Sequence, residues 1–122
     1  MIKYYYDTYA IIEYLQGNKN FKKYFKKGLG VTTKLNLMEL YYAYIDDEDF
    51  ADEVYETFLV NVIEITDQQI KKAMSLRKDM KDKKLNVSYV DAIGYTISFE
   101  LGIRFLTGDR EFETLPNVEF IK

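Results

Sequence analysis

The chain contains no cysteine and no histidine, and this double absence removes most of the common catalytic side chains. Without cysteine there is no disulfide, no thiolate nucleophile and no zinc–thiolate site. Without histidine, the usual general base and the usual nitrogen ligand of zinc are missing, and a Ser-His-Asp triad cannot form. Any catalysis must therefore rest on carboxylates, lysines, hydroxyls or a bound ion.

Proline and glycine are also scarce, with 1 and 6 residues in a chain of 122, and no Ser- or Gly-rich stretch occurs. A composition of 48% hydrophobic and 30% charged residues fits one compact domain over residues 1–122. No apolar run approaches the ~20 residues that a membrane-spanning helix needs. We therefore expect a cytoplasmic protein that does not enter a membrane.

The charge balance is slightly acidic, with 20 acidic and 17 basic residues and a net charge of −3, which does not favour general adhesion to nucleic acid. Basic residues nevertheless gather in two clusters, Lys19, Lys22, Lys23, Lys26 and Lys27 with nearby Phe21, Tyr24 and Phe25, and Lys71, Lys72, Arg77, Lys78, Lys81, Lys83 and Lys84. Lysines beside exposed aromatic rings would suit single-stranded RNA. Solvated helix faces whose aromatic side chains point into the core are the plainer interpretation.

β-prone runs alternate with helical spacing along the whole chain. The pattern predicts strands at residues 2–6, 29–33, 61–65, 103–106 and 118–121, with helices beginning near residues 8, 21, 37, 46, 67 and 89. Short connections between strands and helices indicate an α/β domain with a mostly parallel central sheet of about five strands.

Ligand sites of parallel sheets lie at the carboxyl ends of the strands. Asp7 directly follows the first predicted strand, and Asp109 lies just beyond the strand that ends at Leu106. Both carboxylates should therefore project from the same edge of the sheet. Two carboxylates on one rim repel each other unless one is protonated or a cation bridges them.

Four acids stand at the starts of helices or the ends of strands: Asp7, Glu39, Asp91 and Asp109. Their contexts are Tyr6-Asp7-Thr8, Leu37-Met38-Glu39-Leu40, Tyr89-Val90-Asp91-Ala92-Ile93 and Leu106-Thr107-Gly108-Asp109-Arg110-Glu111-Phe112. In this order and at these intervals, the four segments resemble the PIN-domain family of metal-dependent ribonucleases, and specifically the VapC-like toxins of toxin–antitoxin pairs. The resemblance runs nearly end to end.

The resemblance implies a PIN-like three-layer sandwich in which Asp7, Glu39, Asp91 and Asp109 hold Mg²⁺ or Mn²⁺ and carry catalysis. It also implies an endoribonuclease acting on single-stranded RNA, a homodimer, and a small antitoxin whose tail covers the acidic pocket. Thr107 matches a supporting hydroxyl two residues before the last acid. Tyr9 departs from the family, whose members often carry Ser or Asn there. Hard divalent ions do prefer carboxylate oxygens, so a chain without His or Cys could hydrolyse phosphodiesters this way.

Each acid also has a plainer interpretation. Asp7 and Asp91 could serve as helix caps and nothing more, and Asp109 could be a turn residue without a further role. Glu39 falls opposite the apolar stripe of its predicted helix, which favours the solvated side. At the level of function, the alternative is a catalytically silent PIN-fold module that binds RNA or protein. The high tyrosine count, with 12 in the chain, predicts partner contacts, especially at Tyr41, Tyr42, Tyr44 and Tyr55. A genome-wide preference for tyrosine explains the count equally well.

Overall fold

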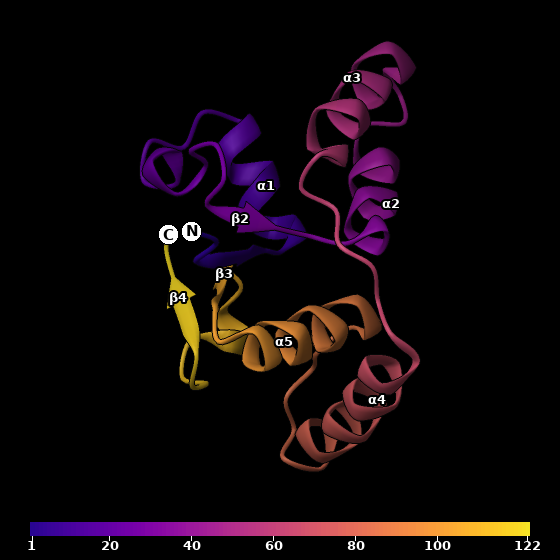
Figure 1. Cartoon of the computed structure of the whole chain (residues 1–122), viewed down its shortest axis with the longest axis vertical. Helices are drawn as coiled ribbons and strands as arrows, with labels where there is room; N and C mark the ends of the chain where they lie inside the picture. Colours follow the sequence, from indigo (N-terminus) through magenta and orange to yellow (C-terminus); the bar gives the residue numbers. More distant parts are fainter.

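The computed structural model describes residues 1–122 and places a parallel sheet between two layers of helices (Figure 1). The sheet has the strand order β2-β1-β3-β4, and all three pairings are parallel. Its strands are β1 (Tyr4–Tyr6), β2 (Gly30–Val31), β3 (Arg104–Thr107) and β4 (Val118–Phe120). The predicted α/β class with a parallel sheet is confirmed.

The fifth predicted strand, at residues 61–65, is reduced to one parallel bridge between Thr32 and Val62. Two backbone hydrogen bonds form it, from Thr32 N–H to the Asn61 carbonyl and from Ile63 N–H to the Thr32 carbonyl, each 3.0 Å long. Thr66, four residues after Val62, already caps the next helix, so the pairing extends no further. The β-prone composition marks this segment correctly as an extended connection beside β2, and the sheet itself contains four strands.

Three helices belong to the first half of the chain: α1 (Thr8–Leu15), α2 (Lys34–Ala43) and α3 (Glu48–Leu59). Two longer ones follow, α4 (Asp67–Asp82) and α5 (Tyr89–Leu101). The helix predicted from residue 21 is only a 3-10 turn, η1 (Lys22–Tyr24), and a second such turn is η2 (Arg110–Phe112). Phe21 and Tyr24 are both buried, and their spacing of three residues puts them on one face of a 3-10 turn.

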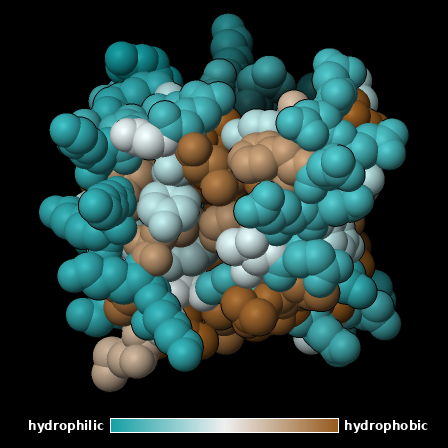
Figure 2. All heavy atoms as spheres, turned by 90° about the horizontal axis from the view of Figure 1, so that it is seen from above, coloured by the Kyte–Doolittle hydropathy of each residue, from teal (hydrophilic) through white to brown (hydrophobic).

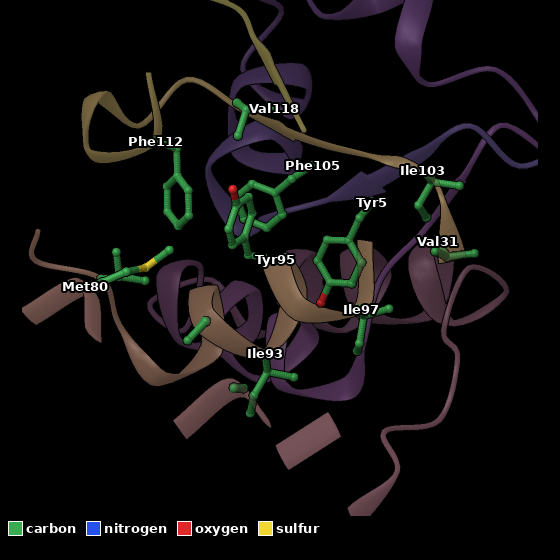
Figure 3. Packing of buried hydrophobic residues seen from close by; sticks show 13 residues of the cluster. Tyr5, Val31, Met80, Ile93, Tyr95, Ile97, Ile103, Phe105, Phe112 and Val118 are labelled. Atoms are coloured by element: carbon green, nitrogen blue, oxygen red, sulfur yellow. The ribbon is translucent and has the colours of Figure 1, made fainter. Parts of the chain in front are cut away.

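The neighbouring residues Tyr5 and Tyr6 point to opposite faces of the sheet and enter two separate cores. Tyr5 stacks on Phe105 with ring centroids 5.7 Å apart, on the face of the sheet that α5 and α4 cover (Figure 3). Tyr6 stacks on Phe25, 4.2 Å away, in the core that contains residues of α1, α2 and α3. One helical layer on each face makes the three-layer sandwich that the resemblance implies.

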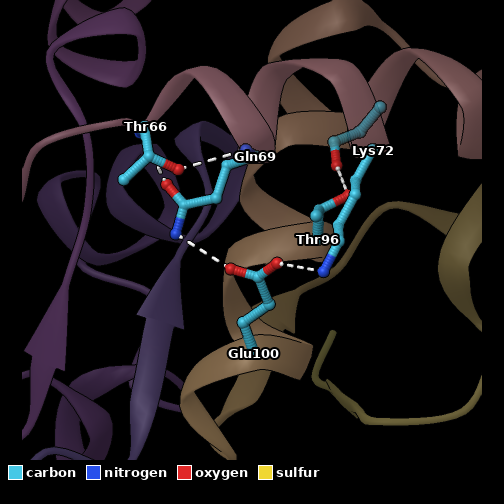
Figure 4. Close-up of polar contacts among 6 residues, drawn as sticks. Thr66, Gln69, Lys72, Thr96 and Glu100 are labelled. Carbon is cyan, nitrogen blue, oxygen red and sulfur yellow. Dashed lines mark hydrogen bonds and ion pairs between the residues drawn. The ribbon is translucent and has the colours of Figure 1, made fainter.

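Polar contacts fix α5 against α4 (Figure 4). Thr66 and Gln69 form a reciprocal capping box at the start of α4. The Gln69 amide then donates to Glu100 on α5 over 3.2 Å, and Lys72 pairs with the same carboxylate at 3.0 Å. These contacts tie the carboxyl-terminal end of α5 to α4, which helps to hold the opposite end of α5 in place at the sheet edge described below.

The surface combines hydrophilic side chains with exposed apolar ones. On the face shown in Figure 2, apolar atoms reach the surface in the middle and hydrophilic side chains frame them. The α2–α3 region and its flanks expose large apolar side chains at Met38, Tyr42, Ile45, Phe50, Leu59 and Val60. No helix combines the length and the apolar character that crossing a membrane would require.

Candidate acidic site at the carboxyl edge of the sheet

Asp7 leaves the end of β1 and caps α1. Its carboxylate accepts a hydrogen bond of 2.7 Å from the Ala10 N–H, which satisfies one of the free amides of the first turn. The side chain is only 2% exposed. A buried carboxylate needs compensating donors, and a hydrogen bond with the Thr107 hydroxyl provides the second one.

Asp109 follows β3 on the same edge and caps η2 through a 3.0 Å hydrogen bond from the Glu111 N–H. The Asp109 N–H donates to the Thr107 hydroxyl oxygen, also over 3.0 Å. Thr107 is completely buried and interacts with both Asp7 and Asp109. Thr107 thus lies beside both acids, and its supporting role stays a prediction.

Asp91 lies in the first turn of α5, where its N–H donates to the hydroxyl of the cap residue Ser88 over 3.0 Å. The first turn of a helix is a favourable place for a carboxylate, because the amide dipoles are positive there. Ser88, and not Asp91, is the N-cap residue of α5. The Asp91 side chain remains partly exposed.

Glu39 lies in α2 and is partly buried, although the apolar stripe favours the solvated side. The Thr8 hydroxyl, at the start of α1, donates to the Glu39 carboxylate over 2.5 Å. The single-helix interpretation of a solvated Glu39 is therefore wrong, because α1 and α2 pack together and cover that side of α2.

A buried chain of polar side chains that the sequence alone does not predict supports Glu39. The Tyr5 hydroxyl donates to Asn36 Oδ1 over 2.5 Å, and Asn36 Nδ2 donates to the Thr8 hydroxyl oxygen over 3.1 Å. Thr8 in turn donates to Glu39. The available signal was the spacing of Asn36 and Glu39, which lie three residues apart and so share one side of the helix. The pair Asn36 and Glu39 therefore marked the side of α2 that faces the site.

Electrostatics show that these carboxylates lie close enough to repel one another. Burial raises the pKa of Asp7 well above its ordinary value, and the charges of Asp91 and Asp109 raise it further. Burial also raises the pKa of Asp91 to about 6, with added repulsion from Glu39 and Asp109. Accumulated negative charge on a sheet edge is costly unless a proton or a cation compensates it.

The donor set suits a hard divalent ion. It consists of carboxylate oxygens with hydroxyl and amide neighbours and contains no nitrogen or sulfur ligand, which favours Mg²⁺ or Mn²⁺ over zinc. In this structure no three acidic side chains approach closely enough to surround one ion. The four acids thus share an edge and repel one another in pairs, and closing them around an ion requires side-chain adjustment.

The raised pKa of Asp91 predicts that Asp91→Asn stabilises the metal-free protein at neutral pH. The folded protein holds the Asp91 proton more tightly than the unfolded chain, so this carboxyl destabilises the fold as the pH rises from about 4 through about 6. Asparagine keeps the side-chain shape and cannot ionise. We expect a gain of about 1–3 kcal/mol in unfolding free energy at pH 7.5 and little gain at pH 4, measured by urea denaturation with a chelator present.

Asp67→Asn is the matched control, because Asp67 occupies the first turn of α4 and is exposed. It should not become more stable at pH 7.5. An equal gain at pH 4 and pH 7.5 for Asp91→Asn would mean that ionisation is not the cause.

Tyr9, the departure from the family pattern, lies beside the acids. Its hydroxyl accepts a 2.6 Å hydrogen bond from Lys122 Nζ. Its ring packs against Gly108, where a Cβ atom would collide with the ring and with the Ile121 carbonyl. Glycine is therefore required just before Asp109, and the Tyr9–Lys122 pair packs against the residue that precedes this acid.

Comparison with protein-family models finds a match to the PIN domain over residues 4–118. No match is found among curated proteins.

Among solved structures, DNA-bound VapBC from Salmonella typhimurium matches with a TM-score of 0.77, at 20% identity over 99% of this chain and 98% of that one. A VapC toxin from Mycobacterium tuberculosis described as cleaving the sarcin–ricin loop also gives 0.77, at 17% identity over 98% and 100% of the two chains. A toxin–antitoxin complex from Klebsiella pneumoniae gives 0.74, at 19% identity over 96% of each chain. At these identities the matches establish a shared fold.

Proposed function

Because this chain belongs to the PIN domain family, we propose that it is a Mg²⁺- or Mn²⁺-dependent endoribonuclease that cuts single-stranded RNA in the cytoplasm. The observation that carries the proposal is the gathering of Asp7, Asp91 and Asp109 at one sheet edge, with raised pKa values for the first two. Without a cation, the negative charges of such a site repel one another. A divalent ion supplies the compensating positive charge.

In this proposal Asp7, Glu39, Asp91 and Asp109 would hold the ion, which when bound would activate a water and neutralise charge on the phosphodiester. The chain's own contribution is orientation. Thr107 fixes Asp7 relative to Asp109 through its hydrogen bonds. On the other side, the Asn36–Thr8 pair directs the Glu39 carboxylate toward the same edge. Preorganised charges of this kind avoid a reorganisation cost when the reaction occurs.

We further propose that the enzyme is a toxin held inactive by a small antitoxin. Support comes from the fold shared with structures described as toxin–antitoxin complexes. A guanidinium on the antitoxin could bridge the carboxylates and take the place of the ion. The exposed apolar side chains of the α2–α3 region, such as Tyr42 and Leu59, offer contact area for the antitoxin or for a second copy in a homodimer.

The test of the proposed function is cleavage of a long single-stranded RNA by the purified protein. We expect fragments with Mg²⁺ or Mn²⁺ and none with excess EDTA, and activity should return when the ion is restored. Cleavage that persists in EDTA would contradict the ion-dependent chemistry. Binding of RNA without cleavage under any ion would favour the silent binding module.

A further inference from the structure

A hollow of about 840 Å³ lies between the segment after α1 and the end of β4. Five exposed lysines surround it: Lys19, Lys22, Lys23, Lys26 and Lys122. We call this feature the lysine hollow. Its apolar floor includes Tyr14, Phe25 and Phe120.

The lysines of the hollow are not paired with acids, and the neighbouring carboxylate, Glu119, accepts a hydrogen bond from Tyr24 and pairs with Arg104. None of its five lysines belongs to any of the protein's ion pairs, and no Asp or Glu lines it. The chain carries a net charge of −3, so this concentration of positive charge runs against the overall balance. Much of the acidic excess gathers elsewhere, along residues 46–56 around the start of α3. The hollow is thus a local attractor for a polyanion.

The aromatic residues of this segment pack into the core, as the plainer interpretation of the sequence has it, and are not exposed for base stacking. Phe21 and Tyr24 are buried. Phe25 is sandwiched between Tyr6 and Tyr14, with ring centroids 4.2 and 4.3 Å away. Rings held in this way stiffen the floor and are not free to rotate onto a base. The surface therefore suits contact with the phosphate backbone through its lysines.

Lys122 connects the hollow to the acidic edge. It donates to the Tyr9 hydroxyl and also lies 4.7 Å from the centre of the Tyr9 ring. Tyr9 packs on Gly108, whose neighbour is Asp109. Lys122, which lines the hollow, is thus linked through Tyr9 to the residue next to Asp109.

The second basic cluster, on α4, is partly occupied by structural contacts. Lys72 pairs with Glu100, and Lys78 lies 3.9 Å from Asp82. Arg77 donates to the Val87 carbonyl and covers the Tyr89 ring. Three of the seven basic residues in this cluster therefore already contact other groups of the protein.

We propose that the lysine hollow binds the phosphate backbone of the RNA strand that is cut at the acidic edge. This inference rests on the proposed function, because it assigns a path to the substrate of that site. Recognition is by charge and does not depend on base sequence, since the side chains around the hollow that are free to reach a ligand are the lysines.

The experiment compares a variant with four substitutions in the hollow, Lys19→Gln, Lys22→Gln, Lys23→Gln and Lys26→Gln, with a control of equal charge change on α4, Lys71→Gln, Lys78→Gln, Lys81→Gln and Lys83→Gln. The probe is a fluorescent single-stranded RNA of mixed sequence, longer than the ~4–16 nucleotides that a single-strand-binding domain covers. Binding is measured by fluorescence anisotropy in EDTA, from about 0.05 to 0.2 M salt.

We expect the hollow variant to bind at least about tenfold more weakly at low salt. Its log–log salt dependence should be shallower by ~0.7 for each phosphate contact that is lost. The α4 control should stay close to the wild type. Unchanged affinity and slope in the hollow variant, or a larger loss in the control, would overturn the inference. Cleavage by the wild type with Mn²⁺ is assayed in parallel. Absent cleavage would show that the proposed function fails, whereas the binding data alone test the lysine hollow.

Discussion

The Asp91→Asn variant is expected to cleave RNA about 10²–10⁴-fold more slowly than the wild type in the presence of Mn²⁺. The substitution keeps the size of the side chain and an oxygen that can accept the Ser88 hydrogen bond, but it removes one negative charge from the proposed ion site. Its N–H remains bonded to the Ser88 hydroxyl, so the cap of α5 is preserved. The lower cleavage rate should therefore result from the missing charge at the site and not from unfolding of the protein.

The measurement is a single-turnover cleavage rate on one long RNA, with folding checked by circular dichroism. Asp67→Asn again serves as the control, because it removes a carboxylate from the first turn of a helix away from the site. It should retain the wild-type rate. An Asp91→Asn rate within a factor of ten of the wild type would remove Asp91 from the catalytic site.

The second large effect concerns the ion itself. Mn²⁺ should raise the melting temperature of the wild type by about 10 °C when its concentration is 100 times the dissociation constant, since preferential binding to the folded state then contributes about 2.7 kcal/mol. The physical reason is the repulsion at the sheet edge. An ion that relieves the repulsion among Asp7, Asp91 and Asp109 stabilises the fold more than it stabilises the unfolded chain.

The double variant Asp7→Asn with Asp109→Asn should lose this response. Asparagine can still cap α1 and η2, because it also offers a side-chain oxygen to the first-turn amides. The variant should therefore fold and melt at a temperature that Mn²⁺ does not change. An unaltered Mn²⁺ shift in the double variant would place the ion elsewhere.

The sequence predicts well those parts of the fold that local chemistry determines. Ser88 and Thr66 cap helices as their positions suggest, and Gly102 ends α5 in the left-handed conformation that glycine adopts easily. The positions of Asp7 and Asp109 at a common edge also follow from parallel pairing of their strands. Each of these features depends on neighbours a few residues away or on a general rule of topology.

The sequence fails where packing between distant segments decides the outcome. The exposure of Glu39 depends on α1 lying across α2, which brings Thr8 to a residue 31 positions further along the chain. Asn36 was missed because its partner Tyr5 is equally remote. At residues 61–65, β propensity cannot reveal that the chain leaves the edge of the sheet after a single bridge.

The basic clusters illustrate the same limit. The lysine and aromatic residues of 19–27 alternate in sequence, and only the tertiary structure separates them into exposed charges and buried rings. Only the resemblance to the PIN family, and not periodicity, implies that Glu39 acts together with three acids from other segments. The family match over residues 4–118 confirms the resemblance, while the roles of the four acids stay a prediction.

The central claim is that Asp7, Glu39, Asp91 and Asp109 together hold a divalent ion. Its most direct test is anomalous diffraction from crystals grown with Mn²⁺ at a saturating concentration. We predict one strong anomalous peak at the carboxyl edge of the sheet, with carboxylate oxygens of at least Asp7, Asp91 and Asp109 at bonding distance or linked to it through bound water. No peak at that edge under saturating Mn²⁺, or a peak held by other residues, would contradict the account.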